Sequence, residues 1–567
     1  MSPDATSSSD GTEVTTSRRR KRRRRRSSGH DRPRRVDRLV QAERVVAIAA
    51  VAAVIFFHWV YLDSAGGLWR DEVNGVNTAA AASIGELWRL AEFESMPVPM
   101  LLALRAWIGV GLGASDFTLR LFGLVSGLAL PAAAWFALRR LTRSAPLVCL
   151  AILAVNPDVV RWSSTVRGWG VGAALAVVSM VLVREASVAL TRRRITFAVI
   201  AAILAVQTQY QNVALLVGIV AAAAAVATTR RRWAEAGVPI GIGAMAVLTL
   251  LPYGGIFERR AAWNALGEMP VTIGDLLGHA WELGSTSGTL VLTCSLALLA
   301  MGLIAAVQWI VSPDVESVNR SRRGVATYAA AAAILSAGAL AVFYRLLAHP
   351  TQPWYYVGIA SFVVVCAEVA VASAAAARMA RTALVVLATV VLVAGAPFAW
   401  TALREPHTNV DHLAARLNAE AAPGDVVVIS PWFLATTVSR YYKGSASLVT
   451  IPPIDDVRVH RYDLVKAAML ETDPMARALP KLQHALESGH QVWVVGSLGA
   501  APGASGARLP PPPLPHTGWN AAPYLAAWAR EVNAFLSAHA LEAREVPVGL
   551  KGGRFEDVGL AALKGWK

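Results

Sequence analysis

The sequence predicts an α-helical membrane protein that crosses the bilayer about eleven times and carries an α/β domain after its last span. Runs of roughly 20 apolar residues, the length needed to cross about 30 Å of hydrocarbon, recur before position 402. Charged residues make up only 16% of the chain, against about 25% in a typical soluble protein. After position 401 the apolar runs give way to short strands that alternate with helical patterns.

A basic segment without apolar periodicity precedes the first span. Arg18 to Arg26 reads RRRKRRRRR within a Ser- and Thr-rich stretch, and this composition predicts a disordered tail over residues 1–42. A positive segment beside a membrane span orients the chain and attracts anionic lipid headgroups, so we expect membrane lipids as its partners and no nucleic acid. The tail therefore predicts a multi-pass protein of the plasma membrane with a cytoplasmic N-terminus.

The predicted transmembrane domain covers residues 43–401. After a first span at 44–62, the remaining spans lie near 117–138, 145–163, 169–189, 195–210, 212–228, 235–254, 289–311, 325–346, 354–376 and 382–401. Basic loops at 137–143, 190–194, 228–232, 319–323 and 378–381 are predicted to be cytoplasmic. If the apolar stretch 97–112 also crossed, it would carry the first of these loops to the wrong face. We therefore expect that stretch to lie in the outer interface or to dip in and return.

Residues 402–567 are predicted to form an extracytoplasmic α/β domain. Strands are expected at 425–430, 447–451 and 491–496, and helices near 407–421, 462–488 and 521–540. Strands that alternate with helices are typical of an α/β fold. No Gly-rich phosphate fingerprint follows any of these strands, so we do not expect a nucleotide-binding domain.

The polar residues predicted on the outer face gather at the mouths of several spans. Asp71 and Glu72 follow the first span directly, and carboxylates beside the apolar layer are candidates for a functional site because they are costly to draw toward it. The other candidates in outer loops are Glu94, Arg167, Arg259, Arg260, His279, Arg345, His349 and Tyr355. Arginines bind phosphate oxygens with charge-assisted hydrogen bonds, and a nearby carboxylate can take a proton from a hydroxyl. Such a set suits a lipid-linked phosphate, whereas for the aromatic residues anchoring at the interface is a stronger expectation than a sugar contact.

Four segments, in this order along the chain, resemble motifs of the GT-C superfamily of polyprenyl-phosphate-sugar-dependent glycosyltransferases. They are WRDEVNGVNTA, ESMPVPMLLALRAWIGVGLGASDFTLRLFGLVSG, NPDVVRWSSTVRGWGVGAAL and HPTQPWYYVGIASFVVV. The resemblance is to the family 39-like and dolichyl-phosphate-mannose mannosyltransferase-like members, and it covers residues 44–400. It implies a GT-C-like transmembrane fold.

The resemblance also implies an activity and roles for residues. A sugar on polyprenyl phosphate would pass, with inversion, to an acceptor hydroxyl of a glycan, lipid or protein. Asp71 would be the general base, and Glu72 would orient it or the acceptor. The leaving phosphate would be bound by Arg167, Arg259, Arg260 and Arg345, with His349 and Tyr355 in the later loop that faces it. Some members hold a divalent metal near the first loop, for which Glu94 with His279, or with His349, are the candidate ligands; no other cofactor is implied.

The chain departs from the family's pattern at two places. Met96 stands where a His or Lys accompanies the first-loop prolines, and Gly168-Trp169 follows Arg167 where many members have an aromatic residue sooner. These departures leave the donor sugar and the metal open.

Two other functions stay open from the sequence. A transporter or flippase of lipid-linked sugars would show internal repeats and polar groups at the bilayer midplane, and no repeat is visible. A non-catalytic membrane scaffold that displays the α/β domain would explain residues 402–567 but not the acids of the first outer loop.

Overall fold

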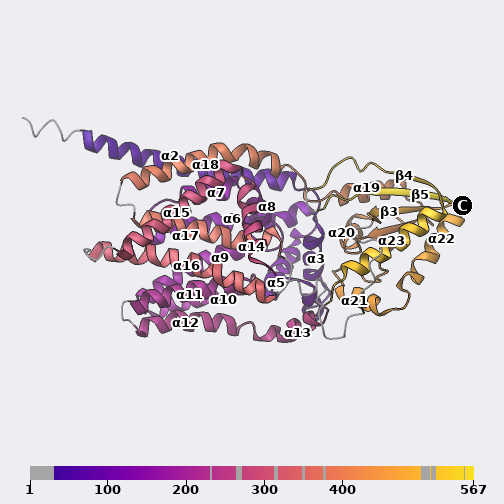
Figure 1. Ribbon diagram of the computed structural model, residues 1–567, viewed down its shortest axis with the longest axis horizontal. Coiled ribbons are helices and arrows are strands. Elements are labelled where there is room, and N and C mark those ends of the chain that lie inside the picture. The colour runs from indigo at the N-terminus through magenta and orange to yellow at the C-terminus, as the bar shows by residue number, and fades with distance from the viewer. Residues whose placement is uncertain are drawn as a thin grey trace, which may run out of the picture.

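A helical bundle and a sheet domain lie end to end along the molecule (Figure 1). The computed structural model describes residues 31–229, 233–263, 271–311, 317–347, 351–374, 378–499, 511, 519–553 and 556–567. The basic segment Arg18 to Arg26 and the candidate residue His349 lie outside these residues. The first helix, α2 (Asp31–Ser64), begins inside the range 1–42 for which we predict a disordered tail.

Eight helical segments in the described part of the chain are long and apolar enough to cross a membrane. They are formed by α2, α6 (Asp116–Leu141), α9 (Trp169–Val188), α12 (Trp233–Leu248) with η3 (Leu251–Tyr253) and α13 (Gly254–Trp263), α15 (Thr289–Val311), α16 (Ser317–Leu347), α17 (Val357–Ala374) and α18 (Arg378–Leu403). Each coincides with a predicted span. The predicted class, a helical polytopic membrane protein, is confirmed.

The three remaining predicted spans are shorter helices packed in the same bundle. α10 (Arg192–Val206) packs on α9, and α11 (Asn212–Thr229) packs on α16. The third prediction, one continuous helix over 145–163, is wrong. The chain there forms α7 (Val148–Val155) and then α8 (Pro157–Ser163).

Asn156 and Pro157 cause this break. The Oδ1 atom of Asn156 accepts the backbone N–H of Val159 at 2.9 Å, so Asn156 is the N-cap of a new helix. Pro157 has no N–H to continue the preceding helix and suits the first position of the next one.

Short helices occupy the end of the bundle that faces the sheet. They are α3 (Arg70–Ala79), α4 (Ile84–Leu90), η1 (Ala91–Phe93), α5 (Val98–Trp107), η2 (Ile108–Leu112), α14 (Ile273–Ser285) and η4 (Pro353–Tyr356). The apolar stretch 97–112 is therefore a short helical segment, and its α5 part packs on α3. On α14, Ile273, Leu277 and Trp281 are 72%, 66% and 63% exposed. An exposed apolar stripe at every fourth residue is typical of a helix that lies in a membrane interface.

The C-terminal region contains a five-stranded sheet with the order β2-β1-β3-β5-β4. β1 (Val426–Ser430) lies between β2 (Ser447–Thr450) and β3 (Gln491–Gly496), and all three are parallel. The antiparallel strands β5 (Leu560–Trp566) and β4 (Ala540–Glu545) extend the sheet beyond β3.

Helices cover both faces of this sheet. Successive apolar side chains of β1 point to opposite faces and all of them are buried, so each face needs a cover. Val427 and Ile429 face α19 (Val410–Glu420) and α20 (Leu434–Tyr441). Val426 and Val428 belong to the opposite core, which is completed by α21 (Tyr462–Leu470), η5 (Pro474–Arg477), α22 (Leu479–Glu487) and α23 (Ala522–His539). The sequence predicts β1, β2 and β3 but not β4 or β5. Five of the six residues of β4 are exposed, so its sequence lacks an apolar alternation.

A polar contact holds the sheet domain against the bundle. The carboxylate of Asp116, in the first turn of α6, pairs with Arg440 at 2.5 Å and accepts the Tyr441 hydroxyl at 2.5 Å. The same hydroxyl accepts the backbone N–H of Leu68 at 2.6 Å. These contacts connect α6, the loop between α2 and α3, and α20 of the sheet domain.

We expect Asp116→Asn to loosen this junction. The variant loses the ion pair with Arg440, and charge-assisted hydrogen bonds of this kind contribute about 1.5–3 kcal/mol. The free energy of unfolding should fall by about that amount, and hydrogen exchange at the Leu68 amide should accelerate. Asp63→Asn, which changes an exposed carboxylate at the end of α2, is the matched control. Equal stability of the two variants would contradict the role of Asp116.

Candidate functional site

A cavity of about 290 Å³ lies where the bundle meets the sheet domain. From the bundle it is lined by Arg70, Asp71, Asn74, Glu94, Arg167, Arg260, Trp354 and Tyr355. From the sheet domain it is lined by Trp432, Phe433, His460 and Tyr462. In Figure 1 the helices that carry or directly follow these residues, α3, α13, α20 and α21, converge at this junction.

Asp71 and Arg167 form an ion pair in this cavity. The Nη1 atom of Arg167 lies 3.4 Å from Oδ2 of Asp71 and also donates to the backbone carbonyl of Asp71 at 3.1 Å. The side chain of Asp71 is 20% exposed and also pairs with Arg70 at 3.6 Å. Burial disfavours the charged form of Asp71, but Arg167 and Arg70 outweigh this effect and lower its pKa below the usual range. Asp71 is therefore an ionised carboxylate at neutral pH.

The guanidinium of Arg167 is held from a second side by the loop after η1. Its Nη2 atom pairs with Oε1 of Glu94 at 3.0 Å and donates to the hydroxyl of Ser95. Glu94 in turn accepts the side-chain amide of Asn74 at 2.8 Å. Two carboxylates thus fix a nearly buried arginine at the floor of the cavity.

The backbone conformation after Arg167 explains why this chain has a glycine at position 168. Gly168 has φ of +66°, a left-handed conformation that favours glycine, and it is the N-cap of α9. A side chain there would also meet the Met100 side chain, whose Cε lies 2.8 Å from the position of an added Cβ. Glycine is therefore required for the sharp entry into α9 that leaves Arg167 at the cavity.

Glu72 does not line the cavity but holds two of its walls together. Its side chain is fully buried and pairs with Arg120 of α6 at 3.5 Å. It also accepts the backbone N–H of Val166 at 3.0 Å. Glu72 is the neighbour of Asp71 and Val166 is the neighbour of Arg167, so this contact sets the relative position of the Asp71–Arg167 pair. Glu72 is a positioning residue in this geometry.

Arg260 and Tyr355 are the other predicted phosphate-site residues that reach the cavity. Arg260 donates to the backbone carbonyl of Glu94 at 3.2 Å. The ring of Tyr355 lies 5.6 Å from that of Trp169.

Other predicted residues lie elsewhere. Arg259 points to Glu92, with which it pairs at 2.5 Å, and its side chain is half exposed. Arg345 is an exposed residue in the last turn of α16 and does not line the cavity. The structure therefore brings together Asp71, Glu94, Arg167, Arg260 and Tyr355.

The two candidate metal ligands are not brought together. His279, on α14, contacts Glu282 at 3.3 Å and the ring of Tyr356, and it does not line the cavity. Both carboxylate oxygens of Glu94 already accept hydrogen bonds from the protein. The described residues contain no group of three or more His, Cys, Asp or Glu side chains that could hold a metal ion. These residues do not fit a divalent metal at this place.

The sheet domain supplies a wall that sequence reasoning missed. The backbone N–H of His460 donates to Oδ1 of Asn74 at 2.8 Å, which places the segment before α21 over α3. Burial lowers the pKa of His460 to about 4, against the opposing effect of Asp71, so its imidazole is neutral at neutral pH. The Nε2 atom of His460 is buried without a hydrogen-bond partner among the described residues. No pattern in VRVHRYD distinguishes this histidine from any other.

Aromatic rings line the same wall. The ring of Tyr462 stacks on Trp263 of α13, with centroids 5.4 Å apart and an angle of 4° between the planes. Trp432 stands nearly perpendicular to Tyr462 at 5.2 Å. Arg70 lies over Phe433, with its guanidinium carbon 4.5 Å from the ring centroid.

Comparison with solved structures supports the fold, whereas no family model and no curated protein matches the sequence. The crystal structure of ArnT from Cupriavidus metallidurans bound to undecaprenyl phosphate has a TM-score of 0.52 and 12% sequence identity, over 91% of this chain and 97% of that chain. ArnT from the same organism in the apo state has a TM-score of 0.49 and 13% identity, over 79% of this chain and 92% of that chain. Because the first alignment spans nearly all of both chains, this chain has the fold of ArnT, and the predicted GT-C-like fold is confirmed.

We expect Glu72→Gln to destabilise the protein by about 3 kcal/mol, because removal of one partner leaves a buried guanidinium without its counter-charge. The measurement is the free energy of unfolding in detergent. Glu258→Gln, which changes an exposed carboxylate on α13, is the matched control. A loss in Glu72→Gln no larger than in the control would show that Glu72 does not hold Arg120 and the segment at Val166.

Proposed function

We propose that this chain is a membrane glycosyltransferase that moves a sugar from a polyprenyl-phosphate donor to an acceptor hydroxyl, with inversion, at the outer face of the plasma membrane. The observation that carries the proposal is the Asp71–Arg167 pair, a carboxylate and a guanidinium 3.4 Å apart in a cavity at one end of the bundle. The fold supports it, since ArnT, whose structure was solved with undecaprenyl phosphate, has a similar fold over 91% of this chain.

The size of the cavity suits a polar headgroup. Its volume of about 290 Å³ is at the lower end of the range for small-molecule sites, which begins near 300 Å³. Such a space holds a sugar and its phosphate, while the polyprenyl chain stays outside in lipid. The exposed apolar stripe of α14 supports an approach of the lipid chain at this end of the bundle.

Arg167 and Arg260 bind the donor phosphate in this proposal. Both guanidinium groups line the cavity, and a guanidinium presents five N–H donors in a fixed plane. Arg260 uses one donor on the carbonyl of Glu94, so donors are left for phosphate oxygens. Two arginines also stabilise the charge that grows on the phosphate as it leaves.

Asp71 is the general base. Its carboxylate accepts the proton of the acceptor hydroxyl, the hydroxyl oxygen forms a bond to the anomeric carbon, and the bond between that carbon and the phosphate oxygen breaks. The polyprenyl phosphate leaves with the electron pair of that bond. Attack from the side opposite the phosphate inverts the anomeric centre.

Donor binding would raise the basicity of Asp71. In the free protein Arg167 stabilises the ionised form of Asp71 and so makes it a weak base. A bound phosphate shares the charge of Arg167, which weakens that stabilisation and raises the pKa of Asp71. The base would then be strongest when the donor is in place.

The sheet domain supplies the acceptor side of the cavity. Tyr462 and Trp432 of this domain, with Trp263 of α13 beside them, offer aromatic surfaces, and a neutral His460 offers a nitrogen without a partner among the described residues. Aromatic faces suit the apolar faces of sugar rings, and a neutral imidazole can donate or accept a hydrogen bond from a hydroxyl. This wall favours a glycan or glycolipid as the acceptor.

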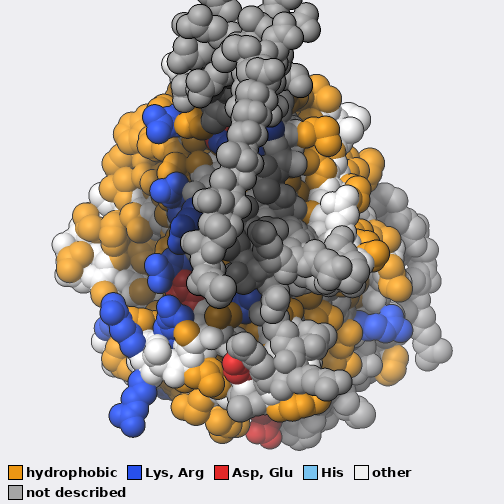
Figure 2. Space-filling view, turned by 90° about the vertical axis from the view of Figure 1, so that its left-hand side faces the viewer, with side chains coloured by type: hydrophobic (Ala, Val, Ile, Leu, Met, Phe, Trp, Pro, Cys, Tyr) orange, Lys and Arg blue, Asp and Glu red, His pale blue; other side chains and the backbone are white. Residues whose placement is uncertain are grey.

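The charge distribution supports an outer-face site. Arg139, Arg143 and Arg192 are exposed at the end of the bundle opposite the sheet domain, which Figure 2 views directly and where Lys and Arg side chains gather. Basic residues beside membrane spans favour the cytoplasm. The cavity lies at the other end.

Asp71→Asn should abolish sugar transfer, with a loss of at least about 100-fold, because general bases contribute roughly 10²- to 10⁴-fold. The assay measures transfer from a polyprenyl-phosphate sugar by purified protein in detergent. Asp63→Asn should retain full activity. If Asp71→Asn folds and transfers sugar at the rate of the control, Asp71 is not the base.

We expect kcat/KM and kcat to fall at different pH values on the acid side of their pH profiles. The profile of kcat/KM reports the free protein, in which Arg167 lowers the pKa of Asp71. The value of kcat/KM should therefore begin to fall at a lower pH than kcat does. The profile of kcat reports the donor complex, and its acid limb should lie about one pH unit higher.

Arg167→Gln provides the control for this difference. Without Arg167 the donor raises the pKa of Asp71 only through the charge of its own phosphate, so the two acid limbs should lie closer together than in the unmodified protein. Identical acid limbs in the unmodified protein would contradict the coupling between Arg167 and Asp71.

A further inference from the structure

A second and larger cavity lies at the end of the bundle opposite the candidate site. Its volume is about 1180 Å³, and it is enclosed by the first half of α2, the last turns of α6, the following loop, the end of α17 and the start of α18. Nothing in the proposed glycosyl transfer uses this cavity.

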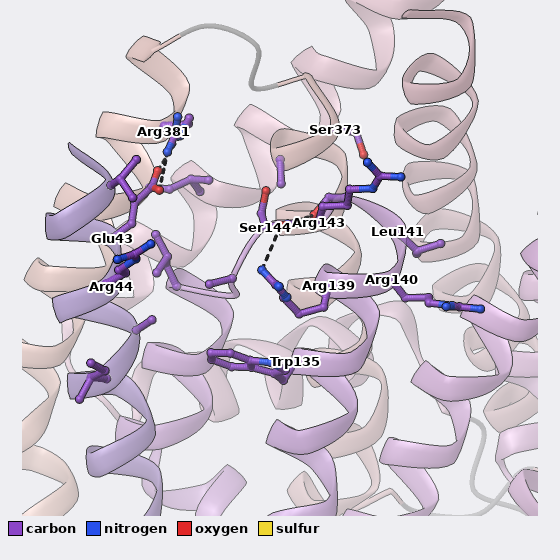
Figure 3. A pocket seen from close by; sticks show the side chains of 18 residues that line it. Glu43, Arg44, Trp135, Arg139, Arg140, Leu141, Arg143, Ser144, Ser373 and Arg381 are labelled. Carbon is purple, nitrogen blue, oxygen red and sulfur yellow. Dashed lines mark hydrogen bonds and ion pairs between the residues drawn. The ribbon is translucent and has the colours of Figure 1, made fainter. Parts of the chain in front are cut away.

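The lining is strongly basic. Five arginines, Arg44, Arg139, Arg140, Arg143 and Arg381, face one carboxylate, Glu43. Glu43 is already paired with Arg381 at 2.5 Å, as the dashed line in Figure 3 shows. Such a cavity attracts an anion, because the charges of its own walls are not balanced.

Three of these arginines have no acidic partner. In Figure 3 the side chain of Arg140 points away from the others. It pairs with Glu185 at 2.5 Å. Within the described residues, no carboxylate lies within ion-pair distance of Arg44, Arg139 or Arg143. Apart from one hydrogen bond that Arg139 donates to a backbone carbonyl, their guanidinium donors are therefore left for a ligand.

The loop after α6 is held in an unusual conformation that keeps two of these arginines together. Arg143 has φ of +64°, a left-handed backbone that costs a residue other than glycine about 1 kcal/mol or more. Its carbonyl accepts a hydrogen bond from Nη1 of Arg139 at 3.2 Å.

Apolar side chains continue the cavity toward the middle of the bundle. Trp135 lies one turn before Arg139 on α6, on the same side of the helix, and is 37% exposed (Figure 3). Ile48 lies one turn after Arg44 on α2 and is 70% exposed. A basic rim above an apolar wall matches a ligand with an anionic head and a hydrocarbon tail.

We propose that this cavity binds an anionic phospholipid of the leaflet at this end of the bundle. The headgroup phosphate accepts hydrogen bonds from Arg44, Arg139 and Arg143, and the acyl chains lie along Trp135 and Ile48. The bound headgroup neutralises arginines contributed by α2 and α6 and so stabilises the packing of the two helices. Basic pockets between membrane helices suit such headgroups.

The test measures lipid binding to the full-length protein by native mass spectrometry and by thermal unfolding. Phosphatidylglycerol is compared with phosphatidylcholine, which carries the same phosphate but no net charge, and with free glycerol phosphate. The unmodified protein should bind phosphatidylglycerol about tenfold or more tightly than phosphatidylcholine and should unfold at a higher temperature in its presence. Equal binding of the two lipids would overturn the proposal, as would binding of glycerol phosphate as tight as that of phosphatidylglycerol, which would indicate a site for a soluble phosphate.

A pair of charge-matched variants locates the site. Arg139→Gln/Arg143→Gln should weaken phosphatidylglycerol binding by about tenfold or more, since each arginine near an anionic headgroup changes affinity by about fivefold. Arg192→Gln/Arg378→Gln removes two exposed arginines at the same end but outside the cavity, and should change the affinity less than twofold. Equal losses in the two double variants would show that only the overall charge of this end attracts the lipid and would overturn the assignment to the cavity. If the first variant does not fold, the lipid comparison on the unmodified protein still decides.

Discussion

The buried ion pair between Glu72 and Arg120 is the interaction on which the candidate site depends. A carboxylate and a guanidinium that leave water together lose hydration, so each must keep its partners. Arg120 meets this need with Glu72 and with the backbone carbonyl of Gly66 at 3.1 Å, and Glu72 adds the backbone N–H of Val166. These contacts fix three parts of the chain relative to one another: the segment 66–72, α6 and the loop before α9. The relative position of Asp71 and Arg167 follows from this arrangement, because Asp71 adjoins Glu72 and Arg167 adjoins Val166.

The bilayer separates two kinds of charged site in this molecule. The spans must be apolar along their length, so ionisable groups collect at their ends. At one end, acids and arginines pair with one another around a small cavity beside the sheet domain. At the other end, arginines exceed acids around a larger cavity. Acids and arginines that pair with one another suit a reaction in which a proton and a phosphate move, whereas arginines without acidic partners suit the retention of an anionic headgroup.

The sheet domain is part of the candidate site and not only an attachment to the bundle. Asp116 of α6 holds Arg440 and Tyr441, and Asn74 of α3 accepts the backbone N–H of His460. These contacts bring the wall formed by His460 and Tyr462 over the Asp71–Arg167 pair. In the proposed reaction the bundle provides the donor side and the base, and the sheet domain provides the acceptor side.

The sequence by itself determined the membrane class, eight of the spans and the candidates Asp71 and Arg167, because a helix that crosses hydrocarbon and a charge at its mouth are local properties of the chain. It also indicated the GT-C fold through the order of short motifs. Only the tertiary structure decided which charges meet. Asp71 and Arg167 are separated by 96 residues, and His460 and Asn74 by 386. The role of Glu72, the exclusion of Arg259 from the cavity and the break at Asn156 likewise depend on partners and backbone turns that packing selects, so no local pattern could reveal them.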